Sequence, residues 1–112
     1  MSPTGQTADG TWEVGVRRTL PLDPDTAWTV LRAVLDEDEH VREVRSETPG
    51  KVVRAAYQRP GWASPSTLQL RVLGAATGTT LAIHHERLPS AEAREAMRRH
   101  WTEALERVSR AS

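Results

Sequence analysis

The sequence predicts an α+β domain in which an antiparallel sheet of about five strands packs against helices on one face, in the order β-α-β-β-β-β-α. Three observations predict this fold class. Apolar and polar residues alternate over 12–20, as in a half-buried strand. Apolar residues at helical spacing follow Asp23 and again Ser90. Between these two helical patterns lie short strand-like runs, separated by turns that contain Pro and Gly.

The chain length of 112 residues is that of one domain. We expect a disordered leader over 1–10, which is aperiodic and rich in Ser, Thr, Gly and Pro, and a single domain over 11–111. The leader has neither the basic nor the apolar segment of a signal peptide, so a cytoplasmic location is expected. No run approaches the ~20 apolar residues of a membrane span, and we expect no membrane partner.

Both predicted helices have a start signal and one apolar face. Asp23 can cap the free N–H groups of the first helix, Pro24 suits its first position, and Ser90 can cap the second helix. The last helix, at ~18 residues and about 27 Å, is long enough to cross the sheet. The acidic run 36–39 ends the first helix, and a solvated loop is expected there rather than a metal or cationic-ligand site. The apolar faces consist of Ala27, Trp28, Leu31, Val34 and Leu35 in the first helix and Ala93, Met97, Trp101, Ala104, Leu105 and Val108 in the second.

Two hairpins are predicted in the middle of the chain. The runs 40–47 and 51–58 flank the turn 48–51, where a Pro presets φ at one corner and a Gly supplies a positive φ at the next. The loop 59–65 leads into a third strand, which pairs with the run 79–87.

The composition excludes several classes of protein. The 15 Lys and Arg residues balance 15 Asp and Glu residues, whereas a nucleic-acid binder usually has a basic excess, so we predict no nucleic-acid partner. The chain has no Cys, which excludes disulfides, thiolate catalysis and Cys-ligated metals. It also lacks a P-loop, a Gly-rich dinucleotide fingerprint and a His-Glu-x-x-His zinc motif, so no cofactor is predicted.

Two segments resemble a known superfamily. The first is Val16 to Leu31, VRRTLPLDPDTAWTVL, a strand followed by a short acidic Pro turn and a helix with an early aromatic residue. The second is Thr79 to Leu88, TTLAIHHERL, followed by a helix with Trp101 in its middle. Together they resemble the START-like (SRPBCC) superfamily, and in particular its branch of homologues of the activator of the ninety-kilodalton heat-shock chaperone's ATPase. The resemblance implies the helix-grip fold, with a ligand cavity between a curved sheet and the long last helix.

The sequence departs from that superfamily after the first helix. Members have a second short helix and a further hairpin there, whereas only the run 36–39 separates the first helix from the next strand here. The comparison implies an internal deletion and a sheet of about five strands rather than six or seven. The cavity is then either smaller and more open or covered by a partner chain. The shortened sheet also leaves an exposed edge that can pair with another chain.

The residues expected to contact a ligand lie on the predicted inner face of the sheet and on the last helix. Most of the aromatic ones also fit a purely structural role, because aromatic rings dominate core burial. Trp62, in a Pro-Gly loop, either closes one end of the cavity or is an exposed anchor for a partner. The expected cavity-lining residues are Tyr57, Trp62, Leu70, Ile83, His85, Met97 and Trp101.

The histidines predict no metal site. His84 and His85 are adjacent in a strand and point to opposite faces, so they cannot bind one metal together. The alternative is a pairing of His85 with His100 and an acidic third ligand, but a hydrogen-bonded core or rim histidine is the more common role.

These observations favour a non-catalytic binding domain that holds a small apolar ligand between the sheet and the C-terminal helix. The alternative is a protein-interaction or regulatory module, either chaperone-cochaperone-like or a homodimer through the sheet edge. A weaker alternative is an enzyme of the cyclase or hydratase type, which the superfamily also contains. His85 with Tyr57 is the only inward polar pair that could serve such an enzyme.

Overall fold

The structure, a computed structural model, describes residues 5–111. Its elements follow the predicted order β-α-β-β-β-β-α, so the expected fold class is confirmed. The elements are β1 (Trp12–Leu20), α1 (Pro24–Glu37), β2 (Val41–Thr48), β3 (Val52–Tyr57), β4 (Ser66–Ala75), β5 (Gly78–Leu88) and α2 (Ala91–Ala111).

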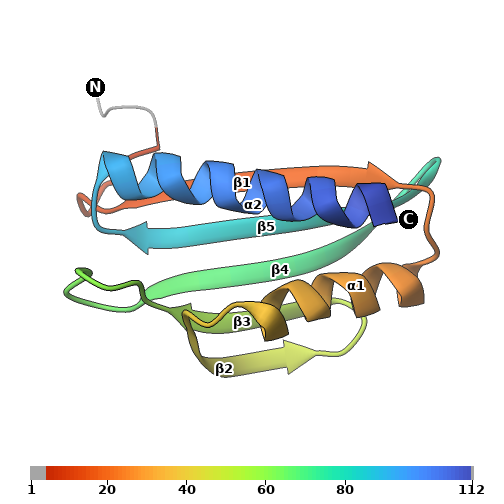
Figure 1. Cartoon of the computed structure of the whole chain (residues 1–112), viewed down its shortest axis with the longest axis horizontal. Helices are drawn as coiled ribbons and strands as arrows, with labels where there is room; N and C mark the ends of the chain where they lie inside the picture. The colour runs from red at the N-terminus through yellow and green to blue at the C-terminus, as the bar shows by residue number, and fades with distance from the viewer. Residues whose placement is uncertain (1–4, 112) are drawn as a thin grey trace.

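The strands form one five-stranded antiparallel sheet in the order β1-β5-β4-β3-β2. Both helices lie on the same face of this sheet, with α2 over β1 and β5 and α1 against β4 and β5 (Figure 1). The opposite face is covered by none of the elements that the structure describes. The strand count and the one-sided arrangement of helices agree with the expectation.

Local signals determine where the helices begin. The Asp23 carboxylate accepts a hydrogen bond from the backbone N–H of Thr26 at 2.7 Å, with Pro24 in the first turn. At α2, the Ser90 hydroxyl oxygen accepts from the N–H of Ala93 at 3.0 Å. The end of α1 differs from the expectation, because the helix continues through Glu37 and the acidic run is not simply a solvated loop.

Two glycines are required by the turns. Gly50 in the β2–β3 turn has φ +80°, as the Pro-Gly signal predicted. Gly78 begins β5 with φ +150°, and a Cβ there would lie 2.0 Å from the carbonyl oxygen of Leu20. A side chain at Gly78 would therefore push the start of β5 away from the end of β1.

Part of the expected leader lies against β1. Residues 1–4 are outside the described residues, whereas residues 5–10 form a turn. The N–H of Glu13 donates to the carbonyl of Gly5 at 2.7 Å, and the N–H of Thr7 donates to that of Thr11 at 2.8 Å. These backbone hydrogen bonds place residues 5–10 beside the sheet. Among the described residues, no helix is long and apolar enough to cross a membrane.

The core fills the space directly between the sheet and α2. Leu70 and Ile83 on the strands and Met97 on the helix are each at most 1 % exposed. Leu31 and Leu35 of α1 are buried to the same extent. Since side chains occupy this layer, any space for a ligand must lie elsewhere.

Candidate functional site

The candidate site is a cleft between α1 and α2, partly open to solvent, with a volume of about 800 Å³. Most of its walls are apolar. One end is polar and is formed where α1 stops near the middle of α2. The apolar lining consists of Leu22, Val30, Ala33, Val34, Trp101, Ala104, Val108 and Ala111, and the polar end of Asp38, His40, Arg59 and His100, with Glu37 and Glu39 beside it; Thr26 and Arg107 also line the cleft.

The helical period explains why α1 has two apolar surfaces. Leu31 and Leu35 face the sheet, whereas Val30, Ala33 and Val34 line the cleft. On α2, His100, Ala104, Val108 and Ala111 recur at helical spacing along the side that lines the cleft. The small alanine side chains leave room between the two helices.

Asp38 organises the polar end of the cleft. It follows the last residue of α1, and its side chain is only 8 % exposed. One carboxylate oxygen lies 2.9 Å from Nε2 of His100 on α2, and the other accepts the backbone N–H of His40 at 3.0 Å. The Tyr57 hydroxyl donates to Asp38 at 3.4 Å and accepts from Nε of Arg59 at 3.0 Å. This network ties the end of α1 to α2 and to β3.

The electrostatics of the network fix two protonation states. Burial opposes ionisation of Asp38, but the hydrogen bonds from His100 and from the N–H of His40 outweigh it and hold the pKa of that carboxyl below its usual value. Burial raises the pKa of Tyr57 to about 12, against the lowering effect of Arg59. At neutral pH Asp38 is therefore charged and Tyr57 neutral. The polar end can offer a ligand hydrogen bonds and the Arg59 cation.

A second hydrogen-bond network is buried in the core beneath the cleft. The indole N–H of Trp101 donates to Nδ1 of His85 at 3.0 Å, so the proton of His85 is on Nε2. That nitrogen donates to the Ser66 hydroxyl at 2.7 Å, which donates to the carbonyl of Tyr57 at 2.6 Å. Burial lowers the pKa of His85 to about 3, and the Arg59 cation contributes to the shift. His85 is a neutral core residue with both ring nitrogens bonded.

The structure gathers four of the seven expected ligand-contacting residues. The rings of Tyr57, Trp62, His85 and Trp101 lie with centroids 4.9 to 6.1 Å apart. Trp62 is half-buried and packs on this group, closing one end of the core. Tyr57 is fully buried. Of the seven, only Trp101 lines the cleft, while Leu70, Ile83 and Met97 lie in the core beneath.

The alternative pairing of His85 with His100 and an acid is not formed. His100 lies against Asp38, and both nitrogens of His85 are engaged by Trp101 and Ser66. The importance of Asp38 was missed because it stands in a run of four acidic residues. A signal was present: Asp38 continues the helical spacing of Leu31 and Leu35, the buried face of α1.

The one-sided antiparallel sheet, the long C-terminal helix and the cleft beside it define a START-like (SRPBCC, helix-grip) fold, in a five-stranded form. No protein-family profile matches the sequence, and no curated protein does. Solved structures do share the fold. An AHSA1-like protein from Rhizobium etli is 16% identical with a TM-score of 0.71, and the match covers 93% of this chain and 84% of that one.

Two further structures extend the comparison. The protein of the Aha1 dimer from Colwellia psychrerythraea is 10% identical with a TM-score of 0.70, covering 88% of this chain and 94% of that one. The di-domain ARO/CYC protein StfQ of the steffimycin biosynthetic pathway is 14% identical with a TM-score of 0.58, covering 82% of this chain and 46% of that one. At these identities the likeness shows the fold alone.

Proposed function

We propose that this chain is a binding domain for a small, mostly apolar ligand with one polar group, held in the cleft between α1 and α2. The observation that carries the proposal is the cleft itself, about 800 Å³ with apolar walls and one polar end. Ligand sites typically have volumes of ~300–1,000 Å³ and combine an apolar lining with a few polar groups. The ligand position differs from the one expected from the sequence, because the layer between the sheet and α2 is filled.

The polar residues of the cleft include two cations, Arg59 and Arg107, which can receive a neutral or anionic head group, and Glu37 and Glu39 favour its placement on the arginine side. Asp38 is already occupied by His100, the N–H of His40 and Tyr57, whereas the Arg59 guanidinium lines the cleft beside it. The apolar part of the ligand would then lie along Val30, Ala33 and Ala104.

Anilinonaphthalene sulfonate (ANS), an apolar ring system with an anionic head, is a suitable probe. We expect saturable 1:1 binding followed by ANS fluorescence. Ala33→Leu places a larger helix-forming side chain in the cleft and should weaken ANS affinity by about tenfold or more, ~1.4 kcal/mol. Thr29→Leu is the matched control, because Thr29 is exposed on the same helix and is not among the lining residues. Equal affinity of the two variants would refute the cleft as the binding site.

The alternative function, pairing with another chain through the sheet edge, has one observation in its favour. Strand β2 lies at the edge of the sheet, and Val44 on it is 42 % exposed. The same strand carries Arg42, Glu43, Arg45 and Glu47 and two irregularities in its pairing with β3. Charged residues and bulges are devices that protect edges from pairing. We therefore expect a monomer in sedimentation velocity, and a stable dimer that Val44→Lys dissociates would favour the alternative.

The cyclase or hydratase alternative depended on His85 and Tyr57. Both are fully buried, and each is engaged in hydrogen bonds within the protein. That pair has no exposed atom to offer a substrate, so the binding role is the one we favour.

A further inference from the structure

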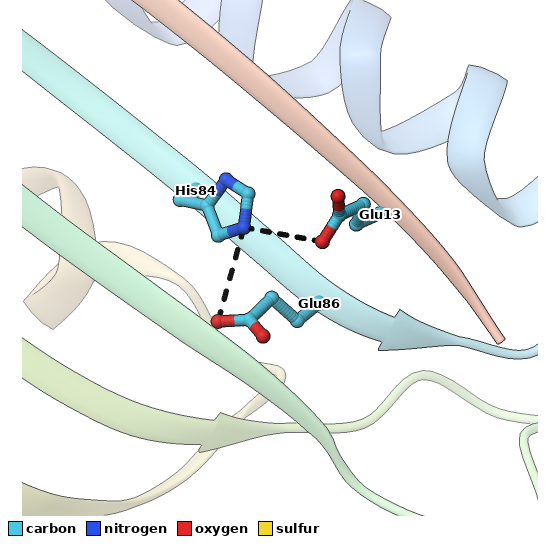
Figure 2. Close-up of side chains that lie close together, drawn as sticks. All are labelled: Glu13, His84 and Glu86. Carbon is cyan, nitrogen blue, oxygen red and sulfur yellow. Dashed lines mark ion pairs between the residues drawn. The ribbon is translucent and has the colours of Figure 1, made fainter. Parts of the chain in front are cut away.

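A second cluster of possible ligands lies on the open face of the sheet, on the side away from both helices. Glu13 from β1 and His84 and Glu86 from β5 turn their side chains toward one another (Figure 2). Nε2 of His84 is 3.5 Å from a carboxylate oxygen of Glu13 and 3.8 Å from one of Glu86. The three potential ligand atoms all lie within 4.8 Å of one another.

The sheet register brings these residues together. His84 and Glu86 are two apart on β5 and so share a face, and β1 is the neighbouring strand. The pairing of β1 with β5 shifts between Trp12 and Val14, where β5 has one extra residue. Arg87 lies in this irregularity with φ +59°, in the left-handed region. The regular register, with Val14 opposite His85, continues to place Glu13 opposite Glu86, and the irregularity changes only the next pair, Trp12 with Leu88.

The donor set suits a divalent transition metal. One imidazole nitrogen and two carboxylate oxygens are the donors that Zn²⁺ takes at ~2.0–2.2 Å, which separates neighbouring ligands by ~3.4 Å in a tetrahedral site. The observed 3.5 and 3.8 Å are close to that value. Two carboxylates also balance the charge of a divalent ion. Mg²⁺ and Ca²⁺ prefer all-oxygen sites, so the imidazole argues against them.

We propose that Glu13, His84 and Glu86 form a binding site for one Zn²⁺-class ion. The three side chains are 41, 41 and 37 % exposed, so water can reach the ion and complete its coordination. The site has three protein ligands and an open position toward solvent. It is independent of the cleft, because His84 and His85 lie on opposite faces of β5 and only His85 belongs to the core beneath the cleft.

Zinc titration of the full chain without a histidine tag tests the proposal. We expect one zinc ion per chain by calorimetry, and Co²⁺ should give a visible absorption band typical of a low-coordinate site. Glu13→Gln, His84→Gln and Glu86→Gln should each weaken zinc affinity by roughly tenfold or more, since loss of even an outer-shell partner costs ~10–100-fold. Zinc should also raise the melting temperature of the unsubstituted protein but not of these variants.

Glu43→Gln is the matched control. Glu43 is 68 % exposed and lies 3.5 Å from Nε of Arg45 on the edge strand β2, at the opposite side of the sheet from β1. We expect this variant to bind zinc like the unsubstituted chain. Absence of saturable zinc binding at millimolar zinc would overturn the proposal, as would equal losses in the control and the three site variants. Far-ultraviolet circular dichroism establishes that each variant is folded, and an unfolded variant is replaced by the corresponding Ala substitution.

Discussion

At the scale of single residues, His85 shows how burial decides a role that sequence cannot. Its position on an inward strand face was predicted, and so was the alternative that it is a hydrogen-bonded core residue. Trp101 donates to one ring nitrogen and Ser66 accepts from the other, so the neutral ring is fully satisfied. The identity of these partners depends on the distance between β5 and α2, which no local pattern specifies.

The buried neutral state of His85 predicts a pH-dependent stability. The unfolded chain binds a proton at this residue below about pH 6.5, whereas the folded chain does so only near pH 3. The free energy of unfolding should therefore fall as the pH drops from 6.5 toward 3, by at most ~1.4 kcal/mol per pH unit from this group. Urea unfolding across that range measures it. His85→Gln should be less stable at neutral pH but should show a shallower fall, and an unchanged slope would contradict the assignment.

The indole N–H of Trp101 should contribute measurably to stability. Trp101→Phe keeps an aromatic ring but leaves Nδ1 of the buried His85 without a donor, which costs ~1–3 kcal/mol. Trp28→Phe is the control, since Trp28 is only half-buried and packs at the margin of the core. Urea unfolding at pH 7 measures the free energy of unfolding of both variants. Equal decreases in the two variants would show that the hydrogen bond contributes little to stability.

At the scale of elements, the sequence predicts the helix ends that are stabilised by local hydrogen bonds, but not the end of α1, whose partner is distant in the sequence. Asp23 and Ser90 were assigned as caps because an N-cap bonds to backbone two or three residues away, entirely within its own segment. Asp38, at the other end of α1, bonds to His100, which is 62 residues further along the chain. Its role follows from how α1 packs beside α2, so the local acidic pattern suggested a solvated loop instead.

Asp38 should therefore matter far more than its acidic neighbours. Asp38→Asn removes a charge that receives several hydrogen bonds and should destabilise the protein by ~1.5–3 kcal/mol at pH 7. Because the folded pKa of Asp38 is below 3.8, its contribution is present above that pH and is lost as the pH falls through the folded pKa. The difference in the free energy of unfolding between the unsubstituted protein and Asp38→Asn should therefore become smaller as the pH falls. Urea unfolding at several pH values measures this difference.

Asp36→Asn is the control for this experiment. The Asp36 side chain is 63 % exposed and, within residues 5–111, pairs with Arg32 on the same helix, so its loss should change stability by less than ~0.5 kcal/mol. Equal effects of the two substitutions would mean that the link between α1 and α2 contributes nothing beyond an ordinary surface charge.

At the scale of the whole molecule, the sequence predicts the architecture better than the position of the cleft. Alternation, helical spacing and turn signals were sufficient for the five strands, two helices and their order. The short connection between α1 and β2, residues 38–40, also agrees with the sequence pattern. Whether the remaining space lies under α2 or between the two helices depends on side-chain packing between pairs of residues that are far apart in the sequence. The sequence pattern carries no direct record of those pairs.

The cluster of Glu13, His84 and Glu86 on the open face could likewise be predicted only in part. The alternation of β5 placed His84 and Glu86 on one side, and that of β1 placed Glu13 outward. Their meeting required knowing that β1 pairs with β5, and that the register sets Val14 opposite His85. Register between strands that are distant in sequence is set by the complete fold rather than by either strand alone.

The most direct test of the proposed cleft uses the four indole N–H signals of the protein in a ¹H–¹⁵N spectrum during titration with ANS. Only Trp101 lines the cleft, while Trp12, Trp28 and Trp62 do not. Single Trp→Phe substitutions assign the four signals. A saturable shift of the Trp101 signal, with the others nearly unmoved and the effect lost in Ala33→Leu, is the predicted result. Shifts confined to the other three signals, or no saturable shift at Trp101, would contradict a ligand site between α1 and α2.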